Sequence, residues 1–262
     1  MSTPIEVAAE RLRAAEDARK PCRPLRDLIG SQDVGAAYAV QEAGTKRRIA
    51  GGARLVGRKI GLTSIAVQKQ LGVDQPDYGM LFANMEVPDG ACVRAGRLIQ
   101  PRVEAEIAFV LGRDLDGEAI TSADVLRAVD YAVCAIEIVD SRIENWDIRI
   151  ADTVADNASS GLYVLGDRPM RVSDVDLGLC GMIAWKNGEI ASLGVGAACL
   201  GNPLRAVLWL AGTMVRVGRP LKAGDVVLSG ALGPMVSVVE GDMFSIRIQG
   251  LGGASVSFPR KA

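Results

Sequence analysis

The chain has 262 residues, 49% of them hydrophobic and 23% charged, and this balance is typical of a globular protein that buries a sizeable core. Its 30 basic side chains are nearly matched by 31 acidic ones and are scattered along the sequence, which argues against a nucleic-acid partner. The chain contains no histidine. Any chemistry must therefore rely on carboxylates, lysines, hydroxyl groups and backbone amides.

Several features bear on the compartment in which the protein works. The first 20 residues carry charges every few positions, unlike the basic end and apolar stretch of a secretory signal. The apolar run 206–215 is too short to span a bilayer. We expect a cytoplasmic protein with no membrane partner, and we interpret its five widely spaced cysteines as reduced core residues: Cys22, Cys92, Cys134, Cys180 and Cys199.

The N-terminal part of the chain is predicted to be helical. Apolar residues recur at helical spacing over 4–19 and again over 33–50, and the glycine pair 51–52 follows the second segment. We expect residues 1–53 to form an N-terminal helical cap. Residues 54–262 would then form a larger, β-rich catalytic domain.

From residue 54 onward the sequence changes to short β-branched runs broken by Gly, Pro, Asp and Asn, which predicts a mostly-β structure. Asn187 and Gly188, between two such runs, predict a hairpin turn. The expected strands are 104–111, 131–139, 161–165, 181–185, 226–229 and 244–257.

Helices are expected to interrupt these strands over 64–71, 122–129 and 203–217. The last is the clearest, because Asn202 can act as its N-cap and Pro203 suits the first helical position. Helices and strands together predict an α+β fold.

The segment "PRVEAEIAF" (101–109) places two glutamates inside an apolar run. In a strand, residues two apart share a face, so Glu104 and Glu106 are expected to point the same way. A solvated strand face would explain the pair in isolation. Beyond Glu106, however, both faces of the run are apolar, which places the carboxylates at the edge of a buried region.

Glu137 interrupts the apolar run "YAVCAIEIVD". A carboxylate buried there is costly unless a cation, hydrogen bonds or protonation compensates it. An ion pair with Arg102 or Arg142 is one explanation. The other is a divalent metal, because Glu104, Glu106 and Glu137 together offer the oxygen ligands that Mg²⁺ or Mn²⁺ prefers. Such a metal could bind a 2-oxo acid substrate and act on its oxygen as a Lewis acid.

Two further residues are candidates for proton transfer. Lys59 follows an apolar stretch and is expected near a strand end, where it could bind a substrate carboxylate or move a proton; a solvated surface lysine is the alternative. Asp77, in "DQPDYG", follows a proline in a predicted turn and could serve as a general base on a loop. A purely turn-forming aspartate is the alternative.

The segment "DTVADNASSG" (152–161) gathers small and polar residues between two apolar runs. Ser159 and Ser160, with nearby backbone amides, are candidates for holding a substrate carboxylate. A helix cap or a turn explains the same residues equally well.

Six stretches taken together resemble the 2-oxopent-4-enoate (2-hydroxypenta-2,4-dienoate) hydratases of the fumarylacetoacetate hydrolase superfamily. The stretches, in the family order, read "VGRKIGLTS", "LGVDQPDYG", "QPRVEAEIAFVLGRDL", "AIEIVDSRI", "VADNASSG" and "LSGALGPMV", and the resemblance as a whole runs from about residue 24 to residue 258. The resemblance implies that Glu104, Glu106 and Glu137 bind metal and that Lys59 and Asp77 belong to the active site. It also implies a mixed β-roll or barrel-like core, homo-oligomers and a place in the meta-cleavage breakdown of aromatic compounds. One departure is Asn202, where similar proteins usually carry His.

The sequence therefore predicts a Mg²⁺- or Mn²⁺-dependent hydratase that adds water to 2-hydroxypenta-2,4-dienoate, giving 4-hydroxy-2-oxopentanoate. Decarboxylation of 4-oxalocrotonate is the first alternative, because it would use the same metal. The second is a non-catalytic relative that associates with a neighbouring pathway enzyme as a scaffold. The accepted substituents at C5, the metal used in the cell, the subunit number and the stereochemistry of water addition are left open.

Overall fold

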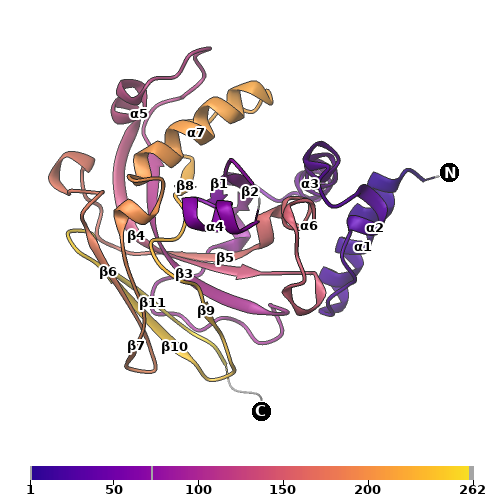
Figure 1. Ribbon diagram of the computed structural model, residues 1–262. Helices are drawn as coiled ribbons and strands as arrows, with labels where there is room; N and C mark the ends of the chain where they lie inside the picture. Colours follow the sequence, from indigo (N-terminus) through magenta and orange to yellow (C-terminus); the bar gives the residue numbers. More distant parts are fainter. Residues whose placement is uncertain (1, 72, 260–262) are drawn as a thin grey trace.

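The computed structural model describes residues 2–71 and 73–259, and in this part of the chain two β-sheets form the centre of the molecule (Figure 1). The larger sheet has the strand order β2-β1-β8-β3-β4-β5, with β9 paired to β3. Its neighbours are antiparallel except for the parallel pair β1 and β8. The strands of this sheet are β1 (Leu55–Gly61), β2 (Asp77–Phe82), β3 (Pro101–Leu111), β4 (Val129–Asp140), β5 (Ser160–Leu165), β8 (Val226–Leu228) and β9 (Val236–Ser237).

The smaller sheet is antiparallel and has the order β11-β10-β6-β7. Its β10 and β11 lie against β4, and β11 also lies against β5, so the two sheets pack on each other as a roll. Apolar side chains of both sheets belong to one core cluster, which includes the fully buried Phe109, Ile136 and Phe244. The strands are β6 (Gly181–Lys186), β7 (Glu189–Val195), β10 (Met243–Ile248) and β11 (Gly252–Ser257).

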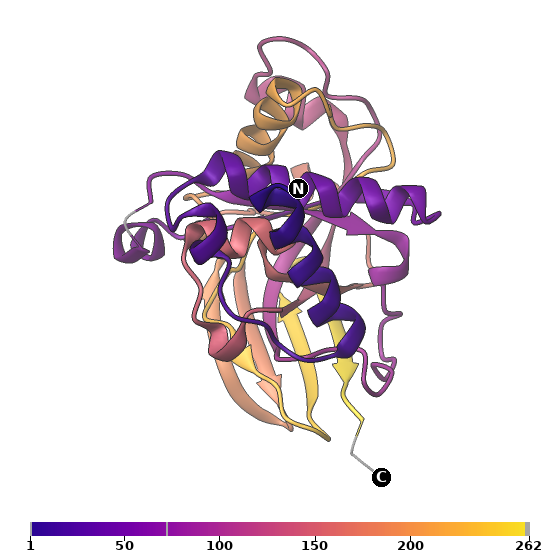
Figure 2. The same cartoon turned by 90° about the vertical axis from the view of Figure 1, so that its right-hand side faces the viewer.

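Helices of the N-terminal segment form a separate layer, seen from the front in Figure 2. They share a second apolar cluster with α6, in which Leu25, Val40 and Val154 are almost completely buried. A segment from residues 150–155 thus completes the core of the N-terminal helices, and the division at residue 53 stays a prediction. The helices of this layer are α1 (Pro4–Ala18), α2 (Arg26–Ile29), α3 (Val34–Ala50) and α6 (Ile150–Ala155).

The remaining helices connect or cover the strands. The α-helices are α4 (Ile65–Leu71), α5 (Ser122–Ala128) and α7 (Pro203–Arg216). Short 3₁₀ turns occupy η1 (Ala83–Met85), η2 (Glu144–Trp146), η3 (Asn157–Ser159), η4 (Val172–Asp174) and η5 (Gly196–Ala198). Among the described residues, no helix combines the length and the apolar character needed to cross a membrane.

The predicted α+β class with a roll-like β core is confirmed, and so are the two long N-terminal helices. The hairpin turn is also where it was expected, because Asn187 (φ 55°) and Gly188 (φ 88°) both take the left-handed conformation between β6 and β7. The prediction of a single run over 244–257 was wrong, because a turn divides it into β10 and β11. Of the cysteines, Cys92 is exposed rather than in the core.

Three strands (β1, β2 and β9) and two helices (α2 and α6) were not among the expected elements. The strand β2 contains Asp77, which was placed on a loop, and α6 lies within the polar segment 152–161. Glycines explain the weak signal of β1: a Cβ atom on Gly57 would lie 1.9 Å from the carbonyl oxygen of Val226 on β8. Close backbone approach requires glycine there, although glycine weakens the local preference for a strand.

The N-cap of α7 gives the first test. The Asn202 side chain accepts a hydrogen bond from the backbone N–H of Leu204 at 2.9 Å, as the sequence predicted. Asn202→Ala removes this acceptor and should lower the free energy of unfolding by about 1 kcal/mol. Asn202→Asp keeps an acceptor and should stay close to the wild type. Chemical denaturation of the three proteins checks this, and equal stability of the alanine and wild-type chains would contradict the assignment.

Candidate metal centre and active site

Three glutamates meet on neighbouring strands of the larger sheet. Glu104 and Glu106 lie on β3, and Glu137 lies on β4 directly opposite Glu104. One carboxylate oxygen from each lies within 4.8 Å of the others. Glu106 and Glu137 are completely buried, so the solvated strand face is ruled out for Glu106. Like charges directly opposite each other destabilise a sheet, and a bound cation would reverse that effect.

Several oxygens of this cluster lack a hydrogen-bond partner. The Oε2 atom of Glu106 accepts a hydrogen bond from the backbone N–H of Gly230 at 2.8 Å. Its Oε1 atom has no partner among the described residues, and neither oxygen of Glu137 accepts a hydrogen bond there. Buried carboxylate oxygens without partners are costly, and a divalent cation with oxygen ligands is the group that would satisfy them.

Burial and mutual repulsion also shift the titration of this cluster. Burial, followed by the negative charge of Glu137, raises the pKa of Glu104 to about 7. The same two causes raise the pKa of Glu106 well above its ordinary value. Without a cation, the cluster therefore tends to hold protons at pH values where glutamates are normally ionised.

Lys59 supplies a positive charge beside the glutamates. It lies on β1 with 3% of its surface exposed, which rules out a solvated surface lysine, and its Nζ atom is 3.2 Å from Oε2 of Glu137. Burial lowers the pKa of Lys59, but the charges of Glu137 and Asp77 outweigh this effect and hold the pKa above its ordinary value. The ammonium group therefore remains charged.

The two arginines expected as partners of Glu137 are engaged elsewhere. Arg142 forms a buried ion pair with Asp156, and the guanidinium of Arg102 lies 4.3 Å from the ring centre of Trp146. The alternative explanation, an ion pair of Glu137 with one of these arginines, is therefore not what the described structure shows. The partner of Glu137 is instead Lys59 on β1, a strand that lies far from β4 in the sequence. The spacing of residues along the chain does not reveal this pair.

Asp77 begins β2 and pairs with Gly61 of β1. It is 3% exposed, and its Oδ1 atom has no hydrogen-bond partner among the described residues. Burial raises the pKa of Asp77, with Lys59 acting in the opposite direction. A Cβ atom on Gly61 would lie 2.2 Å from Oδ1 of Asp77 and 3.6 Å from Nζ of Lys59. Both charged groups therefore lie over the space that this glycine leaves free.

The serine pair occupies a different setting. The Ser159 hydroxyl lies 3.2 Å from the Thr153 hydroxyl within the segment of α6 and η3. Ser160 begins β5, and its buried hydroxyl has no partner among the described residues. Neither hydroxyl forms a hydrogen bond with the three glutamates in the described structure, so a role in substrate binding stays a prediction.

Gly230 is a site residue that the sequence analysis missed. Its φ of 108° belongs to the region that favours glycine, and a Cβ atom there would lie 2.2 Å from Oγ1 of Thr63. This conformation directs its N–H to Glu106. The glycines of "LSGALGPMV" were the available signal, because a backbone N–H at such a position can bind an anionic oxygen.

The carboxylate cluster predicts metal binding that can be measured directly. Glu106→Gln keeps the shape of the side chain but removes one charge, so its affinity for Mg²⁺ and Mn²⁺ should fall at least about tenfold, as expected when a charged ligand is lost. Glu118 is exposed and lies outside the cluster, so Glu118→Gln is the matched control and should bind like the wild type. Isothermal titration calorimetry on the three metal-free proteins checks this, and undiminished affinity in Glu106→Gln would contradict the assignment.

The raised pKa values predict how the metal-free protein responds to pH. Between the ordinary glutamate pKa near 4.5 and the raised pKa of Glu104 near 7, the folded state binds more protons than the unfolded state. The free energy of unfolding should therefore fall as pH rises through this window, by up to about 1.4 kcal/mol per pH unit for each such group.

Denaturation of metal-free protein from pH 5 to 8 provides the measurement. The decrease in the free energy of unfolding with rising pH should be smaller in Glu106→Gln, because one carboxyl group with a raised pKa is removed. Saturating Mg²⁺ should abolish this decrease. A stability that rises with pH over this window in the metal-free wild type would contradict the prediction.

Comparison with known proteins places this geometry in a family. A family model described as fumarylacetoacetate (FAA) hydrolase C-terminal matches residues 52–257. The 2-keto-4-pentenoate hydratase 1 of Dechloromonas aromatica (strain RCB) is 62% identical over 253 residues, which cover 97% of this chain and 96% of that protein. The TodF product hydratase of Pseudomonas putida (strain F1) is 60% identical over 256 residues, which cover 98% and 96%.

A solved structure shows the same architecture. The 4-oxalocrotonate decarboxylase from Pseudomonas putida G7, complexed with magnesium and adipate, is 38% identical and superposes with a TM-score of 0.92 over 97% of both chains. The relatives and the solved structure thus match nearly the whole chain, and the family model matches residues 52–257 within it. This chain belongs to the fumarylacetoacetate hydrolase family.

Proposed function

We propose that the protein is a divalent-metal-dependent hydratase acting on 2-hydroxypenta-2,4-dienoate, the enol form of 2-keto-4-pentenoate. The observation that carries this proposal is the gathering of three glutamates, two of them completely buried, with the buried Lys59 and Asp77 at one place in the larger sheet. Full-length similarity to proteins named 2-keto-4-pentenoate hydratase supports the substrate class. The product would be 4-hydroxy-2-oxopentanoate, within the meta-cleavage breakdown of aromatic compounds.

The residues present fit a divalent cation. Glu106 Oε1 and the two oxygens of Glu137 accept no hydrogen bond in the described structure, and these oxygens and the short separations within the cluster suit an ion such as Mg²⁺ or Mn²⁺. Glu104, Glu106 and Glu137 would hold it. When bound, the cation would supply Lewis-acid polarisation of the oxygen at C2 of the substrate.

The protein's own groups would manage charge and protons. The charged Lys59, which is buried beside the glutamates, would attract the substrate carboxylate and orient it. Asp77 has a raised pKa and a free oxygen, so it suits the exchange of a proton with water or substrate. The enol hydroxyl loses its proton and C5 gains one; water then adds its hydroxyl to C4 and a proton to C3.

Decarboxylation of 4-oxalocrotonate is the rival reaction, and the similarity to the magnesium-bound decarboxylase supports it as an alternative. Both reactions place negative charge at the C2 oxygen, so the three glutamates do not distinguish them. Hydration also needs a base that can activate water, and Asp77 is a buried carboxylate available for that task. The higher identity to the hydratases, 62% against 38%, supports the same choice.

A non-catalytic scaffold is the second rival. A scaffold would not need four buried ionisable groups, Glu106, Glu137, Lys59 and Asp77, at one place, since burying each of them lowers stability unless the group is used or compensated. The intact cluster with Lys59 and Asp77 therefore supports an enzyme. Association with neighbouring pathway enzymes remains compatible with catalysis.

We also propose a cytoplasmic homo-oligomer. The strand β7 lies at the end of the smaller sheet, and its Ile190 and Leu193 are 61% and 58% exposed. Exposed apolar side chains on an edge strand favour self-association. All five cysteines are free, as is usual in a reducing compartment.

The proposed function is tested through Asp77. Asp77→Asn removes the base but keeps the size of the side chain, so the rate of dienoate hydration should fall by about a hundredfold or more while Mg²⁺ affinity changes little. Asp167 is exposed, and Asp167→Asn serves as the control. Loss of dienoate absorbance, with and without Mg²⁺, measures the rate. Rapid release of carbon dioxide from 4-oxalocrotonate by the wild type, with no hydration, would establish the rival reaction instead.

A further inference from the structure

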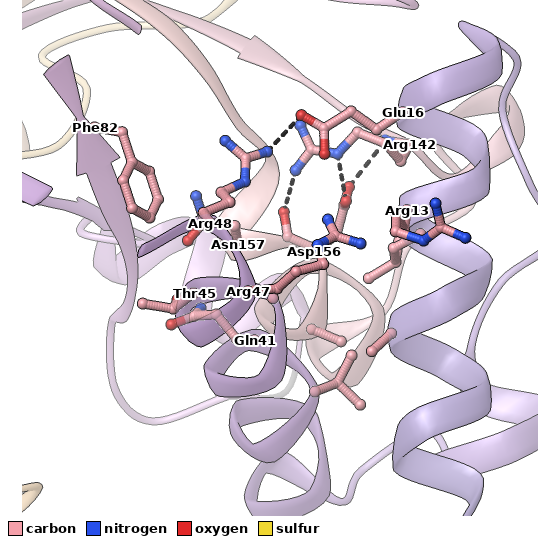
Figure 3. Close-up of a pocket in the computed structure, with 15 residues that line it drawn as sticks. Arg13, Glu16, Gln41, Thr45, Arg47, Arg48, Phe82, Arg142, Asp156 and Asn157 are labelled. Carbon is pink, nitrogen blue, oxygen red and sulfur yellow. Dashed lines mark hydrogen bonds and ion pairs between the residues drawn. The ribbon is translucent and has the colours of Figure 1, made fainter. Parts of the chain in front are cut away.

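A cavity of about 480 Å³ lies outside the glutamate cluster, between the C-terminal end of α1 and the loop that precedes β3. None of the three glutamates, Lys59 or Asp77 lines it. It borders the smaller cavity of Figure 3, because Glu16, Arg48 and Arg142 line both. Five arginines contribute to the lining of the larger cavity: Arg19, Arg48, Arg94, Arg97 and Arg142.

Two of these arginines are already neutralised. Figure 3 shows Arg48 directed toward Glu16, at an ion-pair distance of 2.5 Å, and Arg142 directed toward Asp156, also at 2.5 Å. These ion pairs form the wall that the two cavities share. They fix the position of the wall, and Glu16 and Asp156 are each already paired with an arginine.

The other three arginines have no carboxylate partner in the described structure. Arg19 donates to the carbonyl oxygen of Glu16, and Arg97 donates to the carbonyl oxygen of Asn84. Arg94 is exposed and makes no side-chain hydrogen bond or ion pair there. Burial and the positive charges of Arg94 and Arg19 lower the pKa of Arg97, so these guanidinium groups repel one another.

The remaining polar groups of the lining do not offset this charge. Asp140 also lines the cavity, but its carboxylate accepts hydrogen bonds from the backbone N–H groups of Ile99 and Gln100. Counting Asp140, Glu16 and Asp156 against the five arginines leaves an excess of two positive charges. Ser160 lines the cavity as well, and its buried hydroxyl has no partner in the described structure.

We propose that this cavity is a second binding site, for a small multiply charged oxyanion with carboxylate or phosphate groups. Three guanidinium groups without a carboxylate partner in the described structure offer the forked donors that such anions bind, and the Ser160 hydroxyl offers one donor more. The volume suits a molecule of metabolite size. The proposal does not depend on the reaction catalysed at the glutamate cluster.

The test uses metal-free protein, because no cation is then present at the glutamate cluster to coordinate an anion. Chelator is removed by dialysis, since it is itself a polycarboxylate. Inorganic phosphate and the tricarboxylate tricarballylate are each titrated by calorimetry at constant ionic strength, with chloride as the balancing anion. We expect saturable binding of one anion per chain, and the tighter of the two probes identifies the class of the ligand.

Variants tie the binding to this cavity. Arg94→Gln and Arg97→Gln should each weaken binding by about tenfold, the effect of losing one charge-assisted contact. The Arg94 side chain makes no hydrogen bond or ion pair within the described structure, so Arg94→Gln should leave the fold intact. Arg247 is exposed on β10 of the other sheet, and Arg247→Gln is the control that should bind like the wild type.

Three results would overturn the proposal. One is the absence of saturable binding of either probe to the wild type. Another is equal weakening by Arg247→Gln, which would show attraction to the surface as a whole. The third is an altered molecular mass of Arg94→Gln in solution with no effect of anions, which would show that this face joins copies of the chain.

Discussion

Two carboxylates face each other directly across the hydrogen-bonded pair of β3 and β4, and much of the surrounding structure compensates for their repulsion. Glu104 and Glu137 are cross-strand neighbours, and Glu106 adds a third negative charge on the same face. Lys59 on β1 compensates part of this negative charge by an ion pair with Glu137. The backbone N–H of Gly230 compensates another part by a hydrogen bond to Glu106. The negative charge that remains uncompensated is the reason why the site suits a divalent cation.

Backbone conformation matters as much as side-chain identity in this arrangement. Gly61 leaves the space that the Asp77 carboxylate occupies, and Gly230 adopts a conformation that directs its N–H to Glu106. Both glycines lie in or beside the strands that carry the charged groups, so the geometry depends on a rigid sheet. Rigid elements hold charged groups more accurately than loops do.

The N-terminal helices are linked to this sheet by a second set of buried charges. Asp152 of α6 accepts a hydrogen bond from the backbone N–H of Leu25 at 2.7 Å, and Arg142 joins Asp156 to the end of β4. Arg142 also donates to the carbonyl oxygen of Ser160 at 2.8 Å. These contacts connect the helical layer, the basic cavity and the strand that carries Glu137, so the helices are integral to the part of the fold around the site.

The sequence by itself determined the chemistry of the site, and the tertiary structure decided its arrangement. The alternation of a strand placed Glu104 and Glu106 on one face, and an interrupted apolar run marked Glu137 as buried, because these signals depend only on neighbouring residues. Their local sequence made Lys59 and Asp77 candidates for proton transfer, and the resemblance to a family implied that both belong to the active site. The pairing of Lys59 with Glu137, the strand around Asp77 and the role of Gly230 depend on which strands lie side by side. The order of strands in the sheet brings together residues that are far apart in the chain. A local sequence pattern does not predict which of them become neighbours.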